Sequence, residues 1–298
     1  MFGSSLAIAE PRVFRPANDP GTAVAMGGCA VAALPLDATC AAIARRLFRQ
    51  AAEGVGLPPD VAHDGATMAS ELAANTLHAH ANIQFHGSPV RPAAGMPELW
   101  LYLRRMGGQQ ELVCKLFDSL PGWKLGVAPD PAGGPADPAG GPADSENGPA
   151  DSENGRGLRV VEGLSEGRWG HHPTRARLGG WKVPGKAVWF AVPVPVTRAL
   201  DRFHGPQPGS CEAASELQSM LDERGIGDQI VRADAPASGM SVLSIRRDLT
   251  VWCRSRVVSW TTRDGRRECR AFYDLVEAAE QIVCRHEELD NSRKAIGG

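Results

Sequence analysis

Apolar residues return at helical spacing in one segment near the start of the chain. In residues 37–53, Ile43, Leu47 and Ala51 fall four positions apart and would share one face of a helix. Asp37 is placed to cap the N-terminus of this helix, because its carboxylate can accept from the unpaired N–H groups of the first turn. The pattern therefore predicts an amphipathic helix that packs on a core.

A second helix is predicted over residues 60–81, with Asp60 as its N-cap. Leu72 lies on the face that would pack into the core. Glu71 and Asn75 are four residues apart and therefore project from the same side of the helix. A carboxylate and a carboxamide held side by side can coordinate a metal ion or orient a water molecule. Taken alone, however, the pair is more typical of a solvated helix face.

Other apolar runs lack helical spacing and are rich in strand-forming residues. Gly107 and Gly108 separate two of these runs and predict a hairpin with a longer loop. A short helix is predicted over residues 158–164. The predicted strands in this part of the chain are residues 29–34, 98–104 and 111–117, a strand that begins at Trp169, and residues 187–194.

Residues 130–157 consist of four seven-residue units, DPAGGPA, DPAGGPA, DSENGPA and DSENGRG. Their proline and glycine content excludes a coiled coil in spite of the seven-residue period, because no apolar seam exists. The units hold too little apolar surface to offset the entropy of ordering them. We therefore predict a flexible Pro/Gly insertion at residues 128–154 within a compact domain.

The chain after residue 196 predicts a separate small unit. Residues 197–209 are typical of a linker, and residues 210–298 follow as an αβββα module. Arginines are frequent between residues 246 and 270. Alternating arginines on the outer face of a small sheet explain this pattern more simply than a nucleic-acid surface does. The predicted elements of this module are a helix at 211–224, strands at 241–245, 249–253 and 257–262, and a helix at 273–289.

Composition excludes several classes of protein. The formal net charge is −2 at pH 7, which does not favour a nucleic-acid partner. The seven cysteines form no C-x-x-C pair and are typical of reduced thiols. No apolar run approaches the ~20 residues that a membrane span needs. Residues 1–24 predict a loose segment without a secretory signal, so we expect a cytoplasmic protein without a membrane partner.

Two further polar signals follow Glu71 and Asn75 along the chain. Asp118 ends an apolar strand and precedes a turn that closes at Gly122, so its carboxylate is placed to accept from an exocyclic amine. The second signal is a glycine-rich box before a helix, Gly155-Arg156-Gly157-Leu158. Glycines let a ligand approach the backbone, and the free N–H groups of a helix N-terminus favour phosphate.

This order of signals resembles the Bergerat-fold ATPases, the superfamily of gyrase, MutL and the histidine-kinase catalytic domain. It is most similar to the bacterial anti-sigma-factor serine kinases and related actinobacterial ATP-binding regulators. The resemblance covers about residues 25–196 and implies a two-layer α/β sandwich, with helices over a mixed, mainly antiparallel sheet. It rests on Glu71-Leu-Ala-Ala-Asn75, Asp118, the Gly155-Arg-Gly157-Leu158 box and the closing strand Lys186-Ala-Val-Trp-Phe190. No family is recognised for residues 210–298.

By this resemblance, Asn75 would bind the Mg²⁺ that bridges the phosphates of ATP, and Asp118 would accept from the adenine amine. Glu71 would act as the base that takes the proton from a substrate serine hydroxyl. The insertion at 128–154 would lie where the family has its lid. The other nucleotide-binding residues would be Gly122, Gly155, Arg156, Gly157 and Leu158.

The implied function is an ATP-dependent serine/threonine protein kinase of the anti-sigma-factor type, which phosphorylates a partner regulator and so controls transcription. The implied protein partner is a sigma factor or an anti-sigma antagonist, and a homodimer is compatible with this interpretation. Leu120 stands where the family carries a glycine, and Ala187 where it often carries a threonine that supports the adenine-binding Asp. These departures leave open a non-catalytic, nucleotide-dependent module that sequesters a partner.

Overall fold

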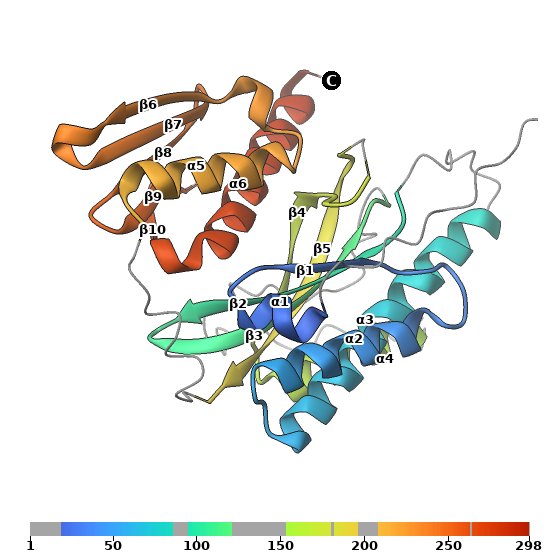
Figure 1. Ribbon diagram of the computed structural model, residues 1–298. Coiled ribbons are helices and arrows are strands. Elements are labelled where there is room, and N and C mark those ends of the chain that lie inside the picture. The colour runs from blue at the N-terminus through green and yellow to red at the C-terminus, as the bar shows by residue number, and fades with distance from the viewer. Residues whose placement is uncertain are drawn as a thin grey trace, which may run out of the picture.

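The computed structural model describes residues 19–85, 95–120, 153–179, 182–195, 208–262 and 264–297 (Figure 1). Gly122 and most of the predicted insertion and linker lie outside these residues. The described chain is α+β and forms two units, each with one antiparallel sheet and its own helices.

The first unit is built on a five-stranded sheet with the order β1-β2-β3-β5-β4. Every neighbouring pair of these described strands is antiparallel, whereas the resemblance implied a mixed sheet. Gly107 and Gly108 join β2 to β3 with φ angles of 58° and 86°, which gives a tight two-residue turn instead of the longer loop predicted. The strands are β1 (Ala30–Ala33), β2 (Glu98–Met106), β3 (Gln109–Asp118), β4 (Trp169–Arg175) and β5 (Pro184–Val194).

Four helices share one hydrophobic core with this sheet (Figure 1). Phe48 and Phe190 meet at its centre, with their ring centroids 5.6 Å apart. Gly65 allows two of the helices to approach closely, because a Cβ there would lie 2.3 Å from the Phe48 ring. The helices are α1 (Pro20–Ala25), α2 (Cys40–Gly54), α3 (Pro59–Phe85) and α4 (Glu153–Ser165).

Helix beginnings are where the sequence-based predictions fail most often. Asp37 does not cap α2; its Oδ1 accepts from the N–H of Thr39 at 2.8 Å and from the Thr39 hydroxyl at 2.5 Å, before the helix starts. Asp60 is the second residue of α3 because Pro59 takes the first helical position, where a missing N–H costs nothing. Residues 20–24, which were expected to be loose, belong to α1.

The second unit is a five-stranded antiparallel meander with the order β10-β9-β8-β7-β6, packed on two helices. The αβββα prediction missed two strands, VRADA and RECRA, because each is only five residues long and has few strand-forming residues. Short 3₁₀ segments occur at Gly227–Gln229, Pro236–Ser238 and Phe272–Asp274. The elements are α5 (Ser210–Asp222), β6 (Val231–Ala235), β7 (Met240–Arg246), β8 (Leu249–Arg254), β9 (Val257–Thr261), β10 (Arg267–Ala271) and α6 (Leu275–Gly297).

Helix α6 belongs to both units and lies between them in Figure 1. Val276, in its first turn, is buried with Tyr102, Val113 and Ala191 of the first sheet. These sheet residues alternate along their strands with those of the first core, so α6 covers the opposite face of the sheet. Farther along α6, residues such as Ile282 pack into the core of the second unit.

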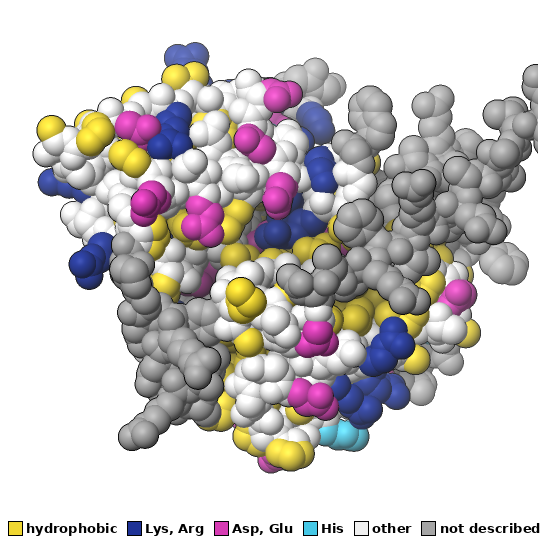
Figure 2. All heavy atoms as spheres, in the orientation of Figure 1, with side chains coloured by type: hydrophobic (Ala, Val, Ile, Leu, Met, Phe, Trp, Pro, Cys, Tyr) yellow, Lys and Arg dark blue, Asp and Glu magenta, His cyan; other side chains and the backbone are white. Residues whose placement is uncertain are grey.

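Charged side chains of both signs are interspersed over both units on the face shown in Figure 2. This face therefore presents no continuous basic surface of the kind that nucleic acid requires. Among the described helices, none combines the length and the apolar character needed to cross a bilayer.

Candidate functional site

Helix α3 holds Glu71 and Asn75 at the surface of the first core. Leu72 and Ala73, which lie between them in sequence, are buried, and this burial fixes the rotation of the helix about its axis. Glu71 and Asn75 are half-buried and lie one helical turn apart on the same side. Their common direction is set by the apolar pattern of the helix, as the sequence predicted.

Gly157 brings the backbone of α4 against this polar pair. A Cβ at Gly157 would lie 2.9 Å from Asn75 Nδ2, 3.0 Å from Glu71 Oε2 and 3.1 Å from Asn75 Oδ1. Any side chain would force these polar groups to move, so the approach depends on glycine. The fold thus brings together three residues that the sequence singled out in two distant motifs.

The Asn75 amide nitrogen is buried and has no hydrogen-bond partner among the described residues. A buried donor left without an acceptor costs about 1–3 kcal/mol. The same carboxamide carries an oxygen that can bind a hard cation such as Mg²⁺. The amide is therefore suited to a ligand that supplies acceptor oxygens, together with a cation.

Helix α4 begins at Glu153, so the glycine-rich box lies inside the helix rather than before it. The prediction that the helix begins after Gly157 is wrong. Gly155 is in the first turn, whose N–H groups have no acceptor within the helix. Leu158 packs against the first core and anchors α4 there. The Arg156 side chain lies outside the described side chains.

Asp118, the last residue of β3, is buried and has three donors of the chain close to its carboxylate. Its Oδ1 accepts from the Leu120 N–H at 2.8 Å and lies 3.1 Å from His80 Nε2. Its Oδ2 lies 3.5 Å from Lys186 Nζ. Burial by itself would raise the pKa of Asp118, but the His80 hydrogen bond, the Lys186 charge and the Leu120 N–H together lower that pKa below its usual value.

The strand next to Asp118 leaves little space around it. A Cβ at Gly185 would lie 2.4 Å from the Asp118 carbonyl oxygen and 2.7 Å from the Phe117 ring. Leu120 and Ala187, which depart from the family pattern, are both buried in the structure. The two substitutions therefore replace a flexible or polar position with packed apolar atoms.

Two polar clusters thus lie along α3. Asn75 belongs to the cluster with Gly157, and His80, five residues later, belongs to the cluster with Asp118. Five residues of α-helix correspond to about 7.5 Å. Sequence reasoning did not single out His80, because no local pattern links a residue of α3 with the end of β3. His78 is exposed, whereas His80 is half-buried and contacts Asp118 of β3.

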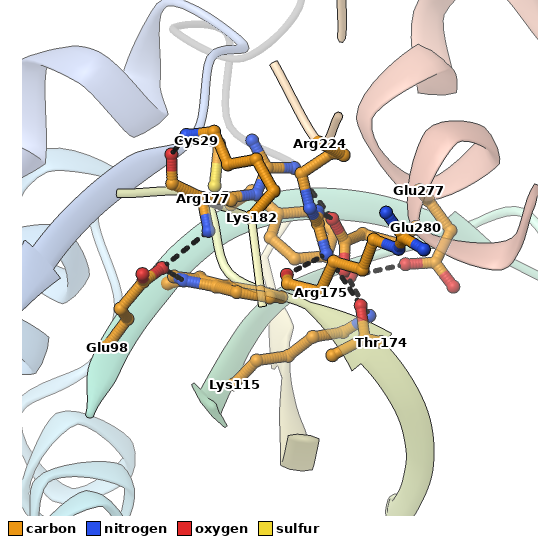
Figure 3. A network of polar contacts seen from close by, with 12 residues as sticks. Cys29, Glu98, Lys115, Thr174, Arg175, Arg177, Lys182, Arg224, Glu277 and Glu280 are labelled. Atoms are coloured by element: carbon orange, nitrogen blue, oxygen red, sulfur yellow. Dashed lines mark hydrogen bonds and ion pairs between the residues drawn. The ribbon is translucent and has the colours of Figure 1, made fainter. Parts of the chain in front are cut away.

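A larger polar cluster joins the two units around Glu280 of α6 (Figure 3). The buried Glu280 carboxylate lies 2.8 Å from Arg177 Nη2 and 3.4 Å from Lys115 Nζ, and it also pairs with the Arg224 guanidinium. Burial alone would raise the pKa of Glu280, but the charges of Arg224, Lys115 and Arg177 lower it well below its usual value. Because every partner is another side chain of the cluster, its evident role is to hold the units together.

His172 also belongs to this junction. His171 and His172 both lie in β4, and His172 Nε2 is 3.1 Å from Lys115 Nζ. Burial and the Lys115 charge lower the pKa of His172 to about 4. The imidazole is therefore neutral at neutral pH and can accept a hydrogen bond from Lys115.

Three residues of α6 with metal-binding side chains, His286, Glu287 and Asp290, lie close together. Glu287 and Asp290 pair with the Arg175 guanidinium, and Asp290 Oδ1 lies 2.6 Å from Arg246 Nη1. Two guanidinium groups already balance these carboxylates, so the group is better explained as an ion-pair cluster than as a metal centre.

Comparisons with known proteins add no family to this description. The chain matches no family model, and the searches of curated proteins and of solved structures return no similar chain.

Proposed function

We propose that this protein is an ATP-binding regulatory protein with a Bergerat fold, of the anti-sigma-factor serine-kinase type. The observation that carries the proposal is the contact of the Gly157 backbone with Glu71 and Asn75. The orphaned Asn75 amide supports it, since a phosphate oxygen would supply the missing acceptor. An antiparallel sheet that shares one core with α1 to α4 is compatible with the fold that the sequence resemblance implies.

In this proposal ATP binds with its phosphates at the first turns of α4 and its base at Asp118. Asn75 would hold Mg²⁺, which neutralises charge on the phosphates when bound. The Asn75 amide donates to a phosphate oxygen, and Gly155 and Gly157 let the phosphates approach the backbone. Glu71 accepts the proton of a serine hydroxyl on a partner protein, whose oxygen takes the phosphoryl group from ATP and leaves ADP.

Calorimetric titration of the full chain with Mg-ATP tests this proposal. We expect a dissociation constant below about 100 μM, which corresponds to about −5.5 kcal/mol. Asn75→Ala should abolish the dependence of binding on Mg²⁺, whereas His63→Ala, at an exposed position of the same helix, should not change it. No detectable binding by the unmodified chain would overturn the proposal.

Phosphoryl transfer requires a separate experiment with labelled ATP and the cognate sigma-factor antagonist. We expect label on a serine of the antagonist. Glu71→Gln should retain Mg-ATP binding and lose the transfer, because the amide cannot accept the serine proton. Transfer that survives this substitution would remove Glu71 from the mechanism without affecting the proposed binding of ATP.

The contacts of Asp118 favour a second candidate, a non-catalytic module that sequesters a partner. Leu120, His80 and Lys186 supply donors to the carboxylate that would recognise adenine, so the base end could have lost its original role. In that case the chain should retain the partner, a sigma factor or its antagonist, in a nucleotide-dependent complex without transferring label to it. Transfer of label from ATP to a serine of the partner would exclude this candidate.

A further inference from the structure

The proposed base-recognition residue is already bound by donors of its own chain. Asp118 is 4% exposed, and its carboxylate pKa is lowered, so it is an ionised acceptor. Leu120 N–H and His80 Nε2 both meet Oδ1, at 2.8 Å and 3.1 Å, and Lys186 Nζ lies 3.5 Å from Oδ2. Because Oδ1 already holds two donors, an adenine amine could reach this oxygen only if one of them gave way.

The three donors differ in how readily they can leave. The Leu120 N–H is part of the backbone that turns at the end of β3, so losing it would disrupt the turn. The Lys186 ammonium is the most distant donor, and it lies near Oδ2 rather than Oδ1. His80 is a side chain that can rotate away, and the N–H it presents to Asp118 Oδ1 is the same kind of donor as an exocyclic amine.

We propose that His80 is an internal competitor of the nucleotide base, occupying Asp118 Oδ1 until the base displaces it, so that His80 sets the affinity and base dependence of the site. This inference rests on the proposed function, since it concerns the same nucleotide site. It also explains how Oδ1, which already holds two donors in the structure, can still serve a ligand. When the base displaces the imidazole, one N–H donor on Oδ1 replaces another, and the Leu120 and Lys186 contacts persist.

The arrangement along α3 separates this effect from the phosphate end. His80 contacts Asp118, and the described contacts of Asn75 and Glu71 involve Gly157. A substitution at His80 should therefore change the binding of ligands that carry a base and leave the binding of bare phosphates unchanged. His78 is exposed on the same helix, which makes it the matched control.

The experiment compares Mg-ATP with Mg-tripolyphosphate, which has the same phosphate groups and no base, on the full chain. His80→Ala should bind Mg-ATP about tenfold more tightly, as expected when one competing hydrogen bond to a charged group is removed. Mg-tripolyphosphate should bind within about twofold of the unmodified chain. His80→Gln, which restores an N–H donor, should return the ATP affinity toward that of the unmodified chain, and His78→Ala should change neither ligand.

The ratio of the two affinities measured on one sample cancels any loss of folded protein in a variant. An unchanged ratio in His80→Ala, or a weaker relative binding of ATP, would overturn the role of His80 and leave the proposed function in place. If neither ligand binds to the unmodified chain or to His80→Ala, the proposed function and this inference both fail.

Discussion

The candidate site depends on glycine at position 157, because a side chain there would collide with Glu71 and Asn75. Taken alone, the polar groups of Glu71 and Asn75 are typical of a solvated helix face. They become candidate site residues because α4 approaches so closely that a Cβ at Gly157 would lie 2.9 Å from Asn75 Nδ2. A glycine inside a helix is usually unfavourable by about 1 kcal/mol relative to alanine. Its presence in α4 is explained by the space that the Asn75 amide occupies.

Gly157→Ala tests this explanation at the residue scale. The new methyl group would meet Asn75 Nδ2 at 2.9 Å, which displaces the amide, so we expect Mg-ATP affinity to fall by at least about tenfold. Because alanine also favours the helix, the free energy of unfolding should change by less than about 1 kcal/mol.

Gly163→Ala is the control, since it lies in the same helix and its Cβ would meet no described atom within 4 Å. It should stabilise the protein by about 0.5–1 kcal/mol and leave ATP binding unchanged. Calorimetry and urea unfolding measure the two effects. Equal ATP affinities for the two variants would contradict the role assigned to Gly157.

At the scale of the element, α3 carries both polar clusters, and its position is set by its contact with α2. Gly65 lies where α3 crosses the Phe48 ring, which in turn packs on Phe190 of β5. The helix is thereby seated on the sheet at a fixed depth. That depth determines whether His80 reaches the end of β3 and whether Asn75 reaches α4.

Gly65→Ala should show how tightly this helix contact is packed. A Cβ at this position would lie 2.3 Å from the Phe48 ring, so either the ring or the helix must shift. We expect a loss of about 1–3 kcal/mol of stability, as in other overpacked cores, instead of the gain that alanine gives in an open helix. A midpoint of urea unfolding equal to or above that of the unmodified chain would contradict this expectation.

At the scale of the whole molecule, α6 makes the two units one packed body. Its Glu277 accepts from the Tyr102 hydroxyl at 2.5 Å. Its Glu280 neutralises cations from β3 and from the segments that follow β4 and α5. The face of the first sheet that lies opposite α2 and α3 is therefore occupied by the chain's own C-terminal unit. A partner of the first unit must bind elsewhere or displace α6.

Glu280→Gln should destabilise this junction strongly. The substitution leaves the buried charges of Lys115, Arg177 and Arg224 without their shared carboxylate, and uncompensated buried charges typically cost about 3–5 kcal/mol. Glu223→Gln, at an exposed position beside Arg224, is the matched control and should cost little. The comparison is made by urea unfolding at pH 7, and equal midpoints for the two variants would argue against the junction.

A pH dependence is expected from Asp274, which is buried where the β2–β3 hairpin meets the start of α6. Burial and the nearby Glu277 raise its pKa to about 7, against the smaller opposing effects of the Arg105 N–H, Arg270 and Arg104. The folded state therefore keeps a proton that the unfolded chain releases near its ordinary pKa of 3.8. The stability from this group is complete below that value and is lost as pH rises to about 7.

Asp274→Asn should remove this dependence. Between pH 5 and pH 7.5 the variant should gain about 2 kcal/mol of stability relative to the unmodified chain, because it has no proton to lose. Asp248→Asn, at an exposed turn, should track the unmodified chain over the same range. Urea unfolding at several pH values measures this, and parallel curves for Asp274→Asn and the unmodified chain would show that Asp274 is already ionised at pH 5.

Elements with a strong local signal were predictable from the sequence. The apolar spacing of α2, α3 and α5 and the aliphatic and aromatic runs of β2, β3, β5 and β8 indicate these elements without reference to long-range contacts. Two kinds of feature were missed. The strands β6 and β10 have few strand-forming residues and are strands because their neighbours offer hydrogen bonds. The starts of α2 and α3 were missed because Asp37 bonds to Thr39 before the helix and Pro59 takes the first helical position.

The sequence by itself identified the residues of the proposed nucleotide site: Glu71 and Asn75 one turn apart, Asp118 at a strand end, and the glycines of a box that it placed before a helix. Helical spacing and turn chemistry are local, so the chain alone carries that information. The tertiary structure decided which of these residues meet. It brought Gly157 to Asn75 and placed His80 and Lys186 beside Asp118. It also packed α6 against the first sheet. Such contacts depend on how helices and sheets pack across long stretches of sequence, which no local pattern specifies.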